Sequence, residues 1–231
     1  MVKLEQILKE TKFIEVKGNR DIDITGITCN SRDVTAGSIF VCIKGFKTDG
    51  HKYLPDAISR GAVCAVVTED IPDPGIPTVK VEDARFAMAQ MSAALYGHPS
   101  RDIKVIGITG TNGKTTTSHL IQTILEMAGK KTGLIGTNSI VIGGKVTASE
   151  RTTPESCVFQ KYLREMADSG AQYCITEVSS HSLELERVTG THFAAAVFTN
   201  LTHEHLDLHG NMENYAAAKA PAVRARSEHR L

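Results

Sequence analysis

Apolar runs and amphipathic stretches alternate along most of this 231-residue chain. In the N-terminal part, apolar runs rich in β-branched residues and bounded by turn residues predict strands at 38–43, 63–68 and 78–81. A short helix is predicted at 53–58. Asp83 can cap a second helix, in which apolar residues recur at helical spacing.

The C-terminal part begins with a predicted strand at 103–109 that leads directly into a glycine-rich turn. The helix after this turn is expected to end at Gly129 and to carry four apolar residues on one face: Leu120, Ile121, Ile124 and Leu125. A helix is also predicted around 158–166, and further strands are predicted at 132–135, 173–178 and 194–199. Strands that alternate with helices predict an α/β fold with a parallel sheet, whose ligand binds at the carboxyl ends of the strands.

Between the two parts, Gly97-His98-Pro99-Ser100 interrupts the pattern. We therefore expect a small N-terminal α/β domain at 1–98 and a second domain at 99–231. The tail at 220–231 contains Pro221 and has no apolar periodicity, so we do not expect it to continue a helix.

The composition is that of an ordinary globular protein, because 41% of the residues are hydrophobic and 23% are charged. Since 26 Lys and Arg balance 26 Asp and Glu, no net charge favours binding to nucleic acid or to an anionic membrane. No apolar run is long enough for a membrane span or a secretion signal. The five cysteines never form a Cys-x-x-Cys pair and are expected to be buried thiols in a reducing cytoplasm.

The stretch after the predicted strand at 103–109 is typical of a phosphate-binding loop: Gly110-Thr111-Asn112-Gly113-Lys114-Thr115-Thr116. Glycines let the backbone approach a phosphate, and amide groups at a helix start point toward it. Lys114 would reach the β- and γ-phosphates of ATP, and the Thr115 hydroxyl would ligate Mg²⁺. The usual pattern has glycine where this chain has Ile108. The alternative is a glycine-rich turn with an incidental lysine, which the flanking strand and helix disfavour.

The residues at 107–116 closely resemble the ATP loop of the Mur ligases and folylpolyglutamate synthetases, which are ATP-dependent amide-forming enzymes. Three further stretches resemble motifs of the Mur ligases that form the UDP-muramoyl tripeptide. They are Asn30-Ser31-Arg32-Asp33-Val34, the stretch at 177–183, and the stretch from Phe198 to Lys219. The resemblance therefore extends from about residue 1 to Lys219.

This resemblance implies an ATP-dependent ligase of peptidoglycan synthesis that acts in the cytoplasm as a monomer. Its substrate would be UDP-N-acetylmuramoyl-L-alanyl-D-glutamate, to which it would add diaminopimelate or lysine through an acyl phosphate. The implied cofactors are ATP, which is a substrate, and Mg²⁺. Residues 1–98 would bind the UDP-substrate, and residues 99–231 would form a P-loop ATPase domain.

Three residues are expected to bind metal together with Thr115. Glu177 ends a predicted strand, where spacing alone leaves open an exposed carboxylate or a Mg²⁺ ligand, and the resemblance favours the ligand. The resemblance implies that His205 binds a second Mg²⁺. It also implies that Lys219 reacts with CO₂ to become N6-carboxylysine, which could ligate or orient the metal. Without the resemblance, Lys219 would be interpreted as a solvated helix lysine.

The substrate contacts are likewise implied by the resemblance. Ser31, together with Cys29, would contact the uridine nucleotide. Hydroxyl and guanidinium groups suit a ligand with pyrophosphate and carboxylate groups, and those implied for the muramoyl-dipeptide belong to Thr152, Thr153, Ser179 and Arg187. Related enzymes often have Gln two residues before this arginine, where this chain has Leu185.

Two alternatives stay open. A zinc hydrolase is one, because four residues resemble its His-x-His-x-Asp-His motif: His203, His205, Asp207 and His209. The intervening Leu208 breaks that spacing, and the phosphate loop would be unexplained. A non-catalytic protein that binds nucleotide and UDP-sugar is the other. Because the tail at 220–231 is unlike the family, we expect a truncated or frame-shifted chain that binds its ligands but ligates poorly or not at all.

Overall fold

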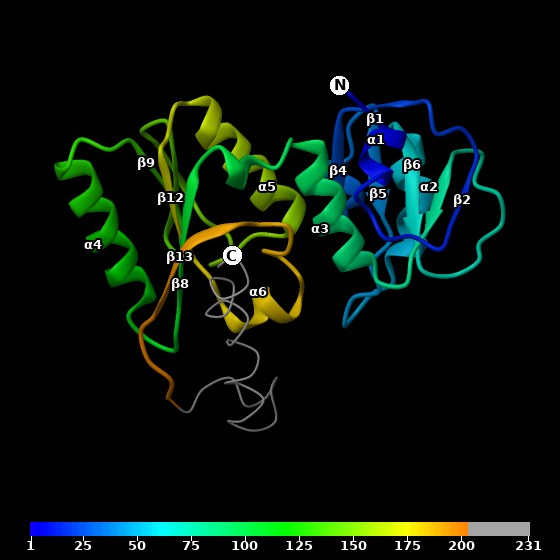
Figure 1. The fold of residues 1–231 in the computed structure, drawn as a ribbon. Coiled ribbons are helices and arrows are strands. Elements are labelled where there is room, and N and C mark those ends of the chain that lie inside the picture. Colours follow the sequence, from blue (N-terminus) through cyan, green and yellow to red (C-terminus); the bar gives the residue numbers. More distant parts are fainter. Residues whose placement is uncertain (203–231) are drawn as a thin grey trace, which may run out of the picture. The chain divides into compact units, whose positions relative to one another are not determined.

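The computed structural model describes residues 1–202 (Figure 1). The chain divides into two compact units, one formed by Met1–Gly97 and one that begins at His98. His205, Lys219 and the tail at 220–231 lie outside the described residues. Among residues 1–202, no helix has both the length and the apolar character that a membrane crossing requires.

The first unit is built on a five-stranded sheet with the order β2-β7-β6-β5-β4. The bounds in that order are β2 (Glu15–Lys17), β7 (Thr78–Lys80), β6 (Ala62–Val67), β5 (Ser38–Val41) and β4 (Gly26–Thr28). The strands from β4 to β7 are parallel, and β2 lies antiparallel to β7 at one edge. A separate antiparallel pair joins β1 (Val2–Lys3) to β3 (Asp23–Ile24).

Three helices and a buried apolar cluster complete this unit: α1 (Leu4–Leu8), α2 (Leu54–Ser59) and α3 (Ala84–Leu95). Helix α2 contacts β6, whereas α3 contacts α1 and β4. Phe40 of β5 is fully buried in a cluster to which α2 contributes Leu54 and Ala57. As expected, the Asp83 carboxylate caps α3, because it accepts hydrogen bonds from the amides of Arg85 and Phe86 in the first turn of that helix.

The second unit contains a six-stranded sheet within the described residues, in the order β11-β10-β9-β12-β8-β13. The bounds in that order are β11 (Lys145–Ala148), β10 (Ser139–Ile142), β9 (Thr132–Ile135), β12 (Tyr173–Glu177), β8 (Lys104–Thr109) and β13 (Phe193–Phe198). The four strands from β9 to β13 in this order are parallel, whereas β10 is antiparallel to both of its neighbours.

Helices cover both faces of this sheet. The second unit has α4 (Lys114–Met127), α5 (Ser156–Asp168) and the short α6 (Ser180–Glu184). Cys174 packs in a cluster with Phe159 and Leu163 of α5, whereas the next residue, Ile175, packs with Ile121 and Leu125 of α4. Consecutive residues of a strand point to opposite faces, so α4 and α5 lie on opposite sides of the sheet (Figure 1).

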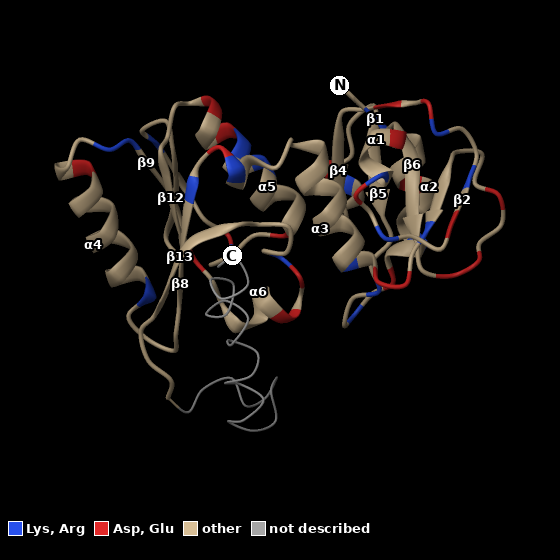
Figure 2. Cartoon of the chain, in the orientation of Figure 1, with Lys and Arg blue, Asp and Glu red and all other residues tan. Residues whose placement is uncertain are grey.

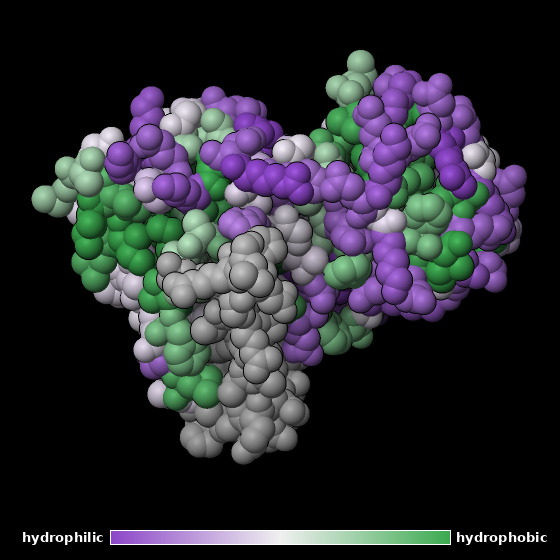
Figure 3. Space-filling model, in the orientation of Figure 1, coloured by the Kyte–Doolittle hydropathy of each residue, from purple (hydrophilic) through white to green (hydrophobic). Residues whose placement is uncertain are grey.

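Helix α4 carries the four apolar residues that were expected on one face, but only two of them pack on the sheet. Ile121 and Leu125 contact the sheet, whereas Leu120 and Ile124 form an outer stripe and are 58% and 64% exposed. Met127 extends this outer stripe and is 84% exposed. Figure 3 shows the apolar surface over α4, and Figure 2 shows that charged residues lie only toward the two ends of this helix. The helix therefore has a second apolar face directed away from the sheet.

The α/β prediction is confirmed, and each predicted strand has its counterpart in a strand whose ends differ by two residues or fewer. The β10–β11 hairpin was not predicted, although its Gly143-Gly144 turn is a dipeptide typical of two-residue hairpins. Both glycines have positive φ angles, of 58° and 81°, which few other residues adopt.

The five cysteines are thiols, as expected, and four of them are buried. Burial raises the pKa of Cys42 and of Cys64 to about 12, and it also raises the pKa of Cys174. Cys29 is half-buried. Because these folded-state pKa values lie above the ordinary value of 9.0, the neutral thiols stabilise the fold fully below about pH 9. That contribution is lost as the pH rises from 9 toward 12.

We expect iodoacetamide at pH 8 to modify Cys29 first and to leave Cys42, Cys64 and Cys174 intact until the protein unfolds. With a pKa of about 12, a thiol has a thiolate fraction on the order of 10⁻⁴ at that pH. Mass spectrometry of peptides labelled with and without urea measures the order, and the urea sample is the control for intrinsic reactivity. Labelling of Cys64 as fast as Cys29 in the folded protein would contradict the buried environment.

Candidate functional site

The carboxyl ends of three neighbouring strands meet at one edge of the second sheet. Strand β12 lies between β8 and β9 and is parallel to both. Each strand is followed there by a polar segment: the glycine-rich loop follows β8, Glu177 ends β12, and Thr137 comes shortly after β9. Ligand sites of parallel α/β sheets form at this edge, so the topology places the predicted phosphate loop beside the predicted metal ligand.

Glycine is required at two positions of the loop for different reasons. Gly110 has a φ of 147°, and an added Cβ would lie 1.9 Å from the Thr199 hydroxyl oxygen. Gly113 has a φ of 82°, and an added Cβ would meet no heavy atom within 4 Å. The first glycine therefore permits close packing of the loop. The second gives the turn from which α4 starts and leaves open space beside the helix N-terminus, where a phosphate would be favoured.

The loop is fixed by the segment that follows β13. Thr111 N donates to Asn200 O at 2.9 Å, and Asn112 N donates to Asn200 Oδ1 at 3.0 Å. In return, Asn200 Nδ2 and Thr199 Oγ1 donate to Asn112 O, at 3.0 and 2.7 Å. These bonds cross between segments about 90 positions apart in the sequence. Thr199 and Asn200 belong to the stretch from Phe198 to Lys219 that resembles the Mur ligases, but no contact between them and the loop was predicted.

Lys114 folds back over its own loop. Its ammonium donates to the Gly110 carbonyl at 2.8 Å and to the Thr111 carbonyl at 2.7 Å. The side chain thus lies over the turn in which a bound phosphate would be held, and the charge is satisfied by neutral acceptors. A phosphate oxygen would offer this ammonium a stronger, charge-assisted hydrogen bond than either carbonyl.

Glu177 is the buried carboxylate of the site, with a relative exposure of 1%. Its Oε2 accepts hydrogen bonds from Thr115 Oγ1 at 3.0 Å and from Thr137 Oγ1 at 2.9 Å. Its Oε1 accepts from Thr137 N at 3.1 Å. A carboxylate and a hydroxyl that meet beside a phosphate loop form the hard oxygen donor set that Mg²⁺ prefers, so Thr115 and Glu177 fit the predicted ion.

The residues predicted for the muramoyl-dipeptide lie next to this carboxylate. The buried Thr153 hydroxyl donates to Glu177 O at 2.8 Å and accepts from Ser179 N at 3.3 Å. Ser179 caps α6, because its hydroxyl accepts from Ser182 N at 3.1 Å. Thr152 Oγ1 lies 3.1 Å from Thr137 Oγ1. The structure therefore brings Thr152, Thr153 and Ser179 to the end of β12.

Arg187 joins the same group through two contacts, one with the backbone carbonyl of Thr153 and one with the carboxylate of Glu155. One guanidinium nitrogen donates to Thr153 O at 3.2 Å, and another lies 2.8 Å from Glu155 Oε1. Arg151 also contacts this Glu155 oxygen, at 2.6 Å. Sequence analysis did not single out Glu155, although its place directly after the Thr152-Thr153-Pro154 turn could have suggested it.

Cys29 and Ser31 lie in the first unit, at the carboxyl end of β4. Ser31 is buried in a 3₁₀ turn, Ser31–Asp33, that begins where the Asn30 side chain accepts a hydrogen bond from Arg32 N. The hydrogen bond from the Ser31 hydroxyl, and then that from Arg60, lowers the pKa of the Asp56 carboxyl. Ser31, which is predicted to contact the uridine, is therefore already hydrogen-bonded to Asp56 of α2.

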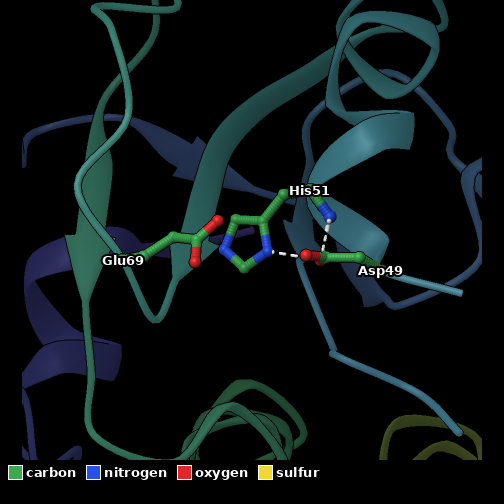
Figure 4. A group of neighbouring side chains, drawn as sticks. All are labelled: Asp49, His51 and Glu69. Atoms are coloured by element: carbon green, nitrogen blue, oxygen red, sulfur yellow. Dashed lines mark hydrogen bonds and ion pairs between the residues drawn. The ribbon is translucent and has the colours of Figure 1, made fainter.

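A second group of potential metal ligands, Asp49, His51 and Glu69, lies in the first unit (Figure 4). Thr68 N donates to His51 Nε2 at 3.3 Å, which assigns the ring proton to Nδ1, and Nδ1 then donates to Asp49 Oδ1 at 2.7 Å. Lys44 pairs with Glu69 at 2.5 Å. Both ring nitrogens of His51 are therefore used, and the group serves to fasten the loop before α2 to the end of β6.

A cleft of about 500 Å³ in the first unit lies between β2, β7 and the loop at 69–77. Its two lysines are paired with carboxylates, Lys80 with Asp70 at 2.7 Å and Lys17 with Glu15 at 3.5 Å. The cleft therefore has no unpaired lysine among its lining residues to attract a phosphate. We therefore place the candidate site at the carboxyl ends of β8 and β12, where the phosphate loop meets Glu177, and not in this cleft.

Two family models match the chain: "Mur ligase middle domain" over residues 108–229 and "Mur ligase family, catalytic domain" over residues 23–96. A UDP-N-acetylmuramoyl-L-alanyl-D-glutamate–2,6-diaminopimelate ligase from Clostridium perfringens is 48% identical over 217 residues, which are 94% of this chain and 45% of that protein. The corresponding ligase from Alkaliphilus metalliredigens is 48% identical over 219 residues, 94% of this chain and 44% of the relative. The chain thus spans less than half the length of these curated relatives.

Solved structures have the same fold. A structure of a UDP-N-acetylmuramoyl-L-alanyl-D-glutamate–2,6-diaminopimelate ligase superimposes with a TM-score of 0.78 at 26% identity, covering 95% of this chain and 44% of that one. A MurF structure from Acinetobacter baumannii gives a TM-score of 0.66 at 21% identity, with 95% and 45% covered.

We expect Thr153→Val to lower the free energy of unfolding by about 1–3 kcal/mol, because it leaves the buried Glu177 carbonyl and the partly buried Ser179 amide without their shared partner. Urea unfolding followed by circular dichroism measures the change. Thr132→Val is the matched control, since its hydroxyl bonds to the exposed Glu126 at 2.6 Å. Equal stability of the two variants would contradict the structural role assigned to the Thr153 hydroxyl.

Proposed function

Because this chain belongs to the Mur ligase family, we propose that residues 1–231 bind the two nucleotide substrates of an ATP-dependent peptidoglycan ligase. The proposed reaction joins diaminopimelate to UDP-N-acetylmuramoyl-L-alanyl-D-glutamate. The observation that carries this proposal is the meeting of Lys114, Thr115 and the buried Glu177 at the carboxyl ends of two parallel strands. The relatives at 48% identity support the choice of substrates.

The proposed chemistry has two balanced steps. The substrate carboxylate attacks the γ-phosphorus of ATP, so that a new carboxyl O–P bond forms, the bond between the γ-phosphorus and the β-phosphate oxygen breaks, and ADP leaves. The amine then attacks the acyl carbon, loses a proton and displaces inorganic phosphate. Pressing a carboxylate against a triphosphate requires positive groups around the transferred phosphoryl group. A bound Mg²⁺ would supply part of that charge.

The chain's own residues would position the nucleotide. Lys114 would exchange its two carbonyl acceptors for β- and γ-phosphate oxygens, while the loop amides and the start of α4 hold the remaining charge. Thr115 and Glu177 would hold the metal. The hydrogen bonds from Asn200 and Thr199 would keep the loop in place during this exchange.

The residues that surround the end of β12 would hold the muramoyl-dipeptide. Arg187 is suited to a carboxylate, because its Nε has no hydrogen-bond partner among the described residues and its other nitrogens are fixed by Glu155 and Thr153. Thr152, Thr153 and Ser179 would add hydroxyl contacts. Leu185, two positions before Arg187, offers no hydrogen bond from its side chain. In the first unit, Ser31 and Cys29 would contact the uridine end.

Two further residues, whose roles rest on the family resemblance, lie outside the described part of the chain. His205 would bind a second Mg²⁺, and Lys219 would act as N6-carboxylysine beside it. The proposed substrates are nucleotides, which fits a cytoplasmic place of action with reduced cysteines. We also retain the proposal of a monomer.

We expect Lys114→Ala to weaken binding of MgATP by about tenfold to a hundredfold, the effect of removing one charged hydrogen-bonding group. Isothermal titration calorimetry measures the affinity. Lys130→Ala, just beyond the end of α4, removes the same charge from an exposed position and is expected to bind as the wild type does. Unchanged affinity of Lys114→Ala would remove the basis of the proposed nucleotide site.

We expect phosphate release from ATP to require both UDP-N-acetylmuramoyl-L-alanyl-D-glutamate and an amino acid, and to be faster with diaminopimelate than with lysine. A coupled phosphate assay that omits each component in turn measures this dependence. Faster release with lysine would overturn the assigned amino acid. Binding of both nucleotides without release would instead favour the non-catalytic alternative.

A further inference from the structure

We propose that Thr137 is a positioning residue that orients Glu177 toward Mg²⁺ and connects it to the substrate-side Thr152. The proposal rests on the proposed function, because it assigns Glu177 as the metal ligand. Thr137 was not among the residues singled out in the sequence. It follows β9, whereas Glu177 ends β12 and Thr152 precedes α5, so the three side chains come from three separate segments.

Thr137 binds both oxygens of the Glu177 carboxylate. Its backbone N–H donates to Glu177 Oε1 at 3.1 Å, and its hydroxyl donates to Oε2 at 2.9 Å. Two donors from one residue fix the rotation of the carboxylate plane as well as its position. A carboxylate has about four lone-pair sites, and the bonds from Thr137 and Thr115 use three of them. Room for a cation remains on the carboxylate.

The Thr137 hydroxyl stands between the carboxylate and the substrate-side Thr152. Its Oγ1 is oriented to donate to Glu177 Oε2 at 2.9 Å and to Thr152 Oγ1 at 3.1 Å. A hydroxyl has one proton, so it can serve only one of these acceptors at a time. The charged carboxylate is the stronger acceptor, so the proton goes to Glu177, and the Thr152 hydroxyl lies directly beside this bond.

Packing does not explain why a threonine stands at position 137. Thr137 is exposed, so its methyl group contributes little to the core. The neighbouring Gly136 is buried, and an added Cβ there would lie 2.6 Å from Glu177 Oε1. The pairing of Ile135 with Thr176 places Gly136 opposite Glu177. The backbone at 136–137 is thus brought directly against the carboxylate, where the Thr137 hydroxyl and amide both act on it.

The consequence is a specific effect on metal-dependent binding. Residues that orient a metal ligand through hydrogen bonds contribute about tenfold to a hundredfold to metal affinity. Thr137→Val keeps the branched shape and the backbone N–H but removes the hydroxyl, so Oε2 loses one of its two donors. Thr137→Ser keeps the hydroxyl. The valine variant should therefore bind the nucleotide normally without metal and poorly with it.

The experiment measures the affinity for a non-hydrolysable ATP analogue by calorimetry, once with excess Mg²⁺ and once with EDTA. The ratio of the two affinities is the gain from Mg²⁺. We expect this gain to fall by about tenfold or more in Thr137→Val, to be retained in Thr137→Ser, and to be unchanged in Thr132→Val. Thr132 starts β9, the strand that Thr137 follows, and its hydroxyl bonds to Glu126 and not to Glu177. It is therefore the matched control. Urea unfolding of each variant confirms that the fold is retained.

The Glu177→Gln variant distinguishes a failure of the metal assignment from a failure of the role proposed for Thr137. A large loss of the Mg²⁺ gain in Glu177→Gln with no loss in Thr137→Val would overturn the role of Thr137 and leave the metal site intact. Equal loss in the serine and valine variants would also overturn it, since the hydroxyl would then be irrelevant. No Mg²⁺ gain in the wild type, together with an unchanged Glu177→Gln variant, would overturn the metal assignment itself and this inference with it.

Discussion

The second unit depends on the burial of one carboxylate at the end of a central strand. A buried charge is strongly destabilising unless hydrogen bonds or counter-ions compensate it. Glu177 obtains its compensation from the start of α4 and from the segment after β9, while its backbone carbonyl accepts from Thr153. The need to satisfy this carboxylate therefore brings together segments that are 40 to 62 positions away in the sequence.

The phosphate loop is organised by a different constraint, the close approach of two backbones. Gly110 allows the loop to touch Thr199, and the bonds between Asn112 and Asn200 then fix its shape. The loop and the carboxylate meet at Thr115, which is the second residue of α4 and donates to Glu177. A shift of β13 would therefore move the loop, and a shift of β9 would move the carboxylate.

The sequence predicted the parts of this arrangement whose chemistry is local. Glycines and a lysine between an apolar strand and an amphipathic helix predict a phosphate loop, and β-branched runs predict the parallel strands around it. Thr137 could not be identified in the same way, because its role depends on which strands are neighbours and in what register. The exposed outer stripe of α4 could not be predicted for a related reason: periodicity identifies apolar positions, but the packing partner decides which of them are buried.

The backbone carbonyls of the phosphate loop compete with any incoming anion for the Lys114 ammonium. With its ammonium held by the carbonyls of Gly110 and Thr111, the loop already satisfies its own cation. An incoming anion must offer this ammonium a stronger hydrogen bond than the two carbonyls do, as a charged phosphate oxygen can. Discrimination among anions can thus begin before any contact with a base or sugar, since a chain of linked phosphates is the kind of ligand that engages the lysine and the helix start together.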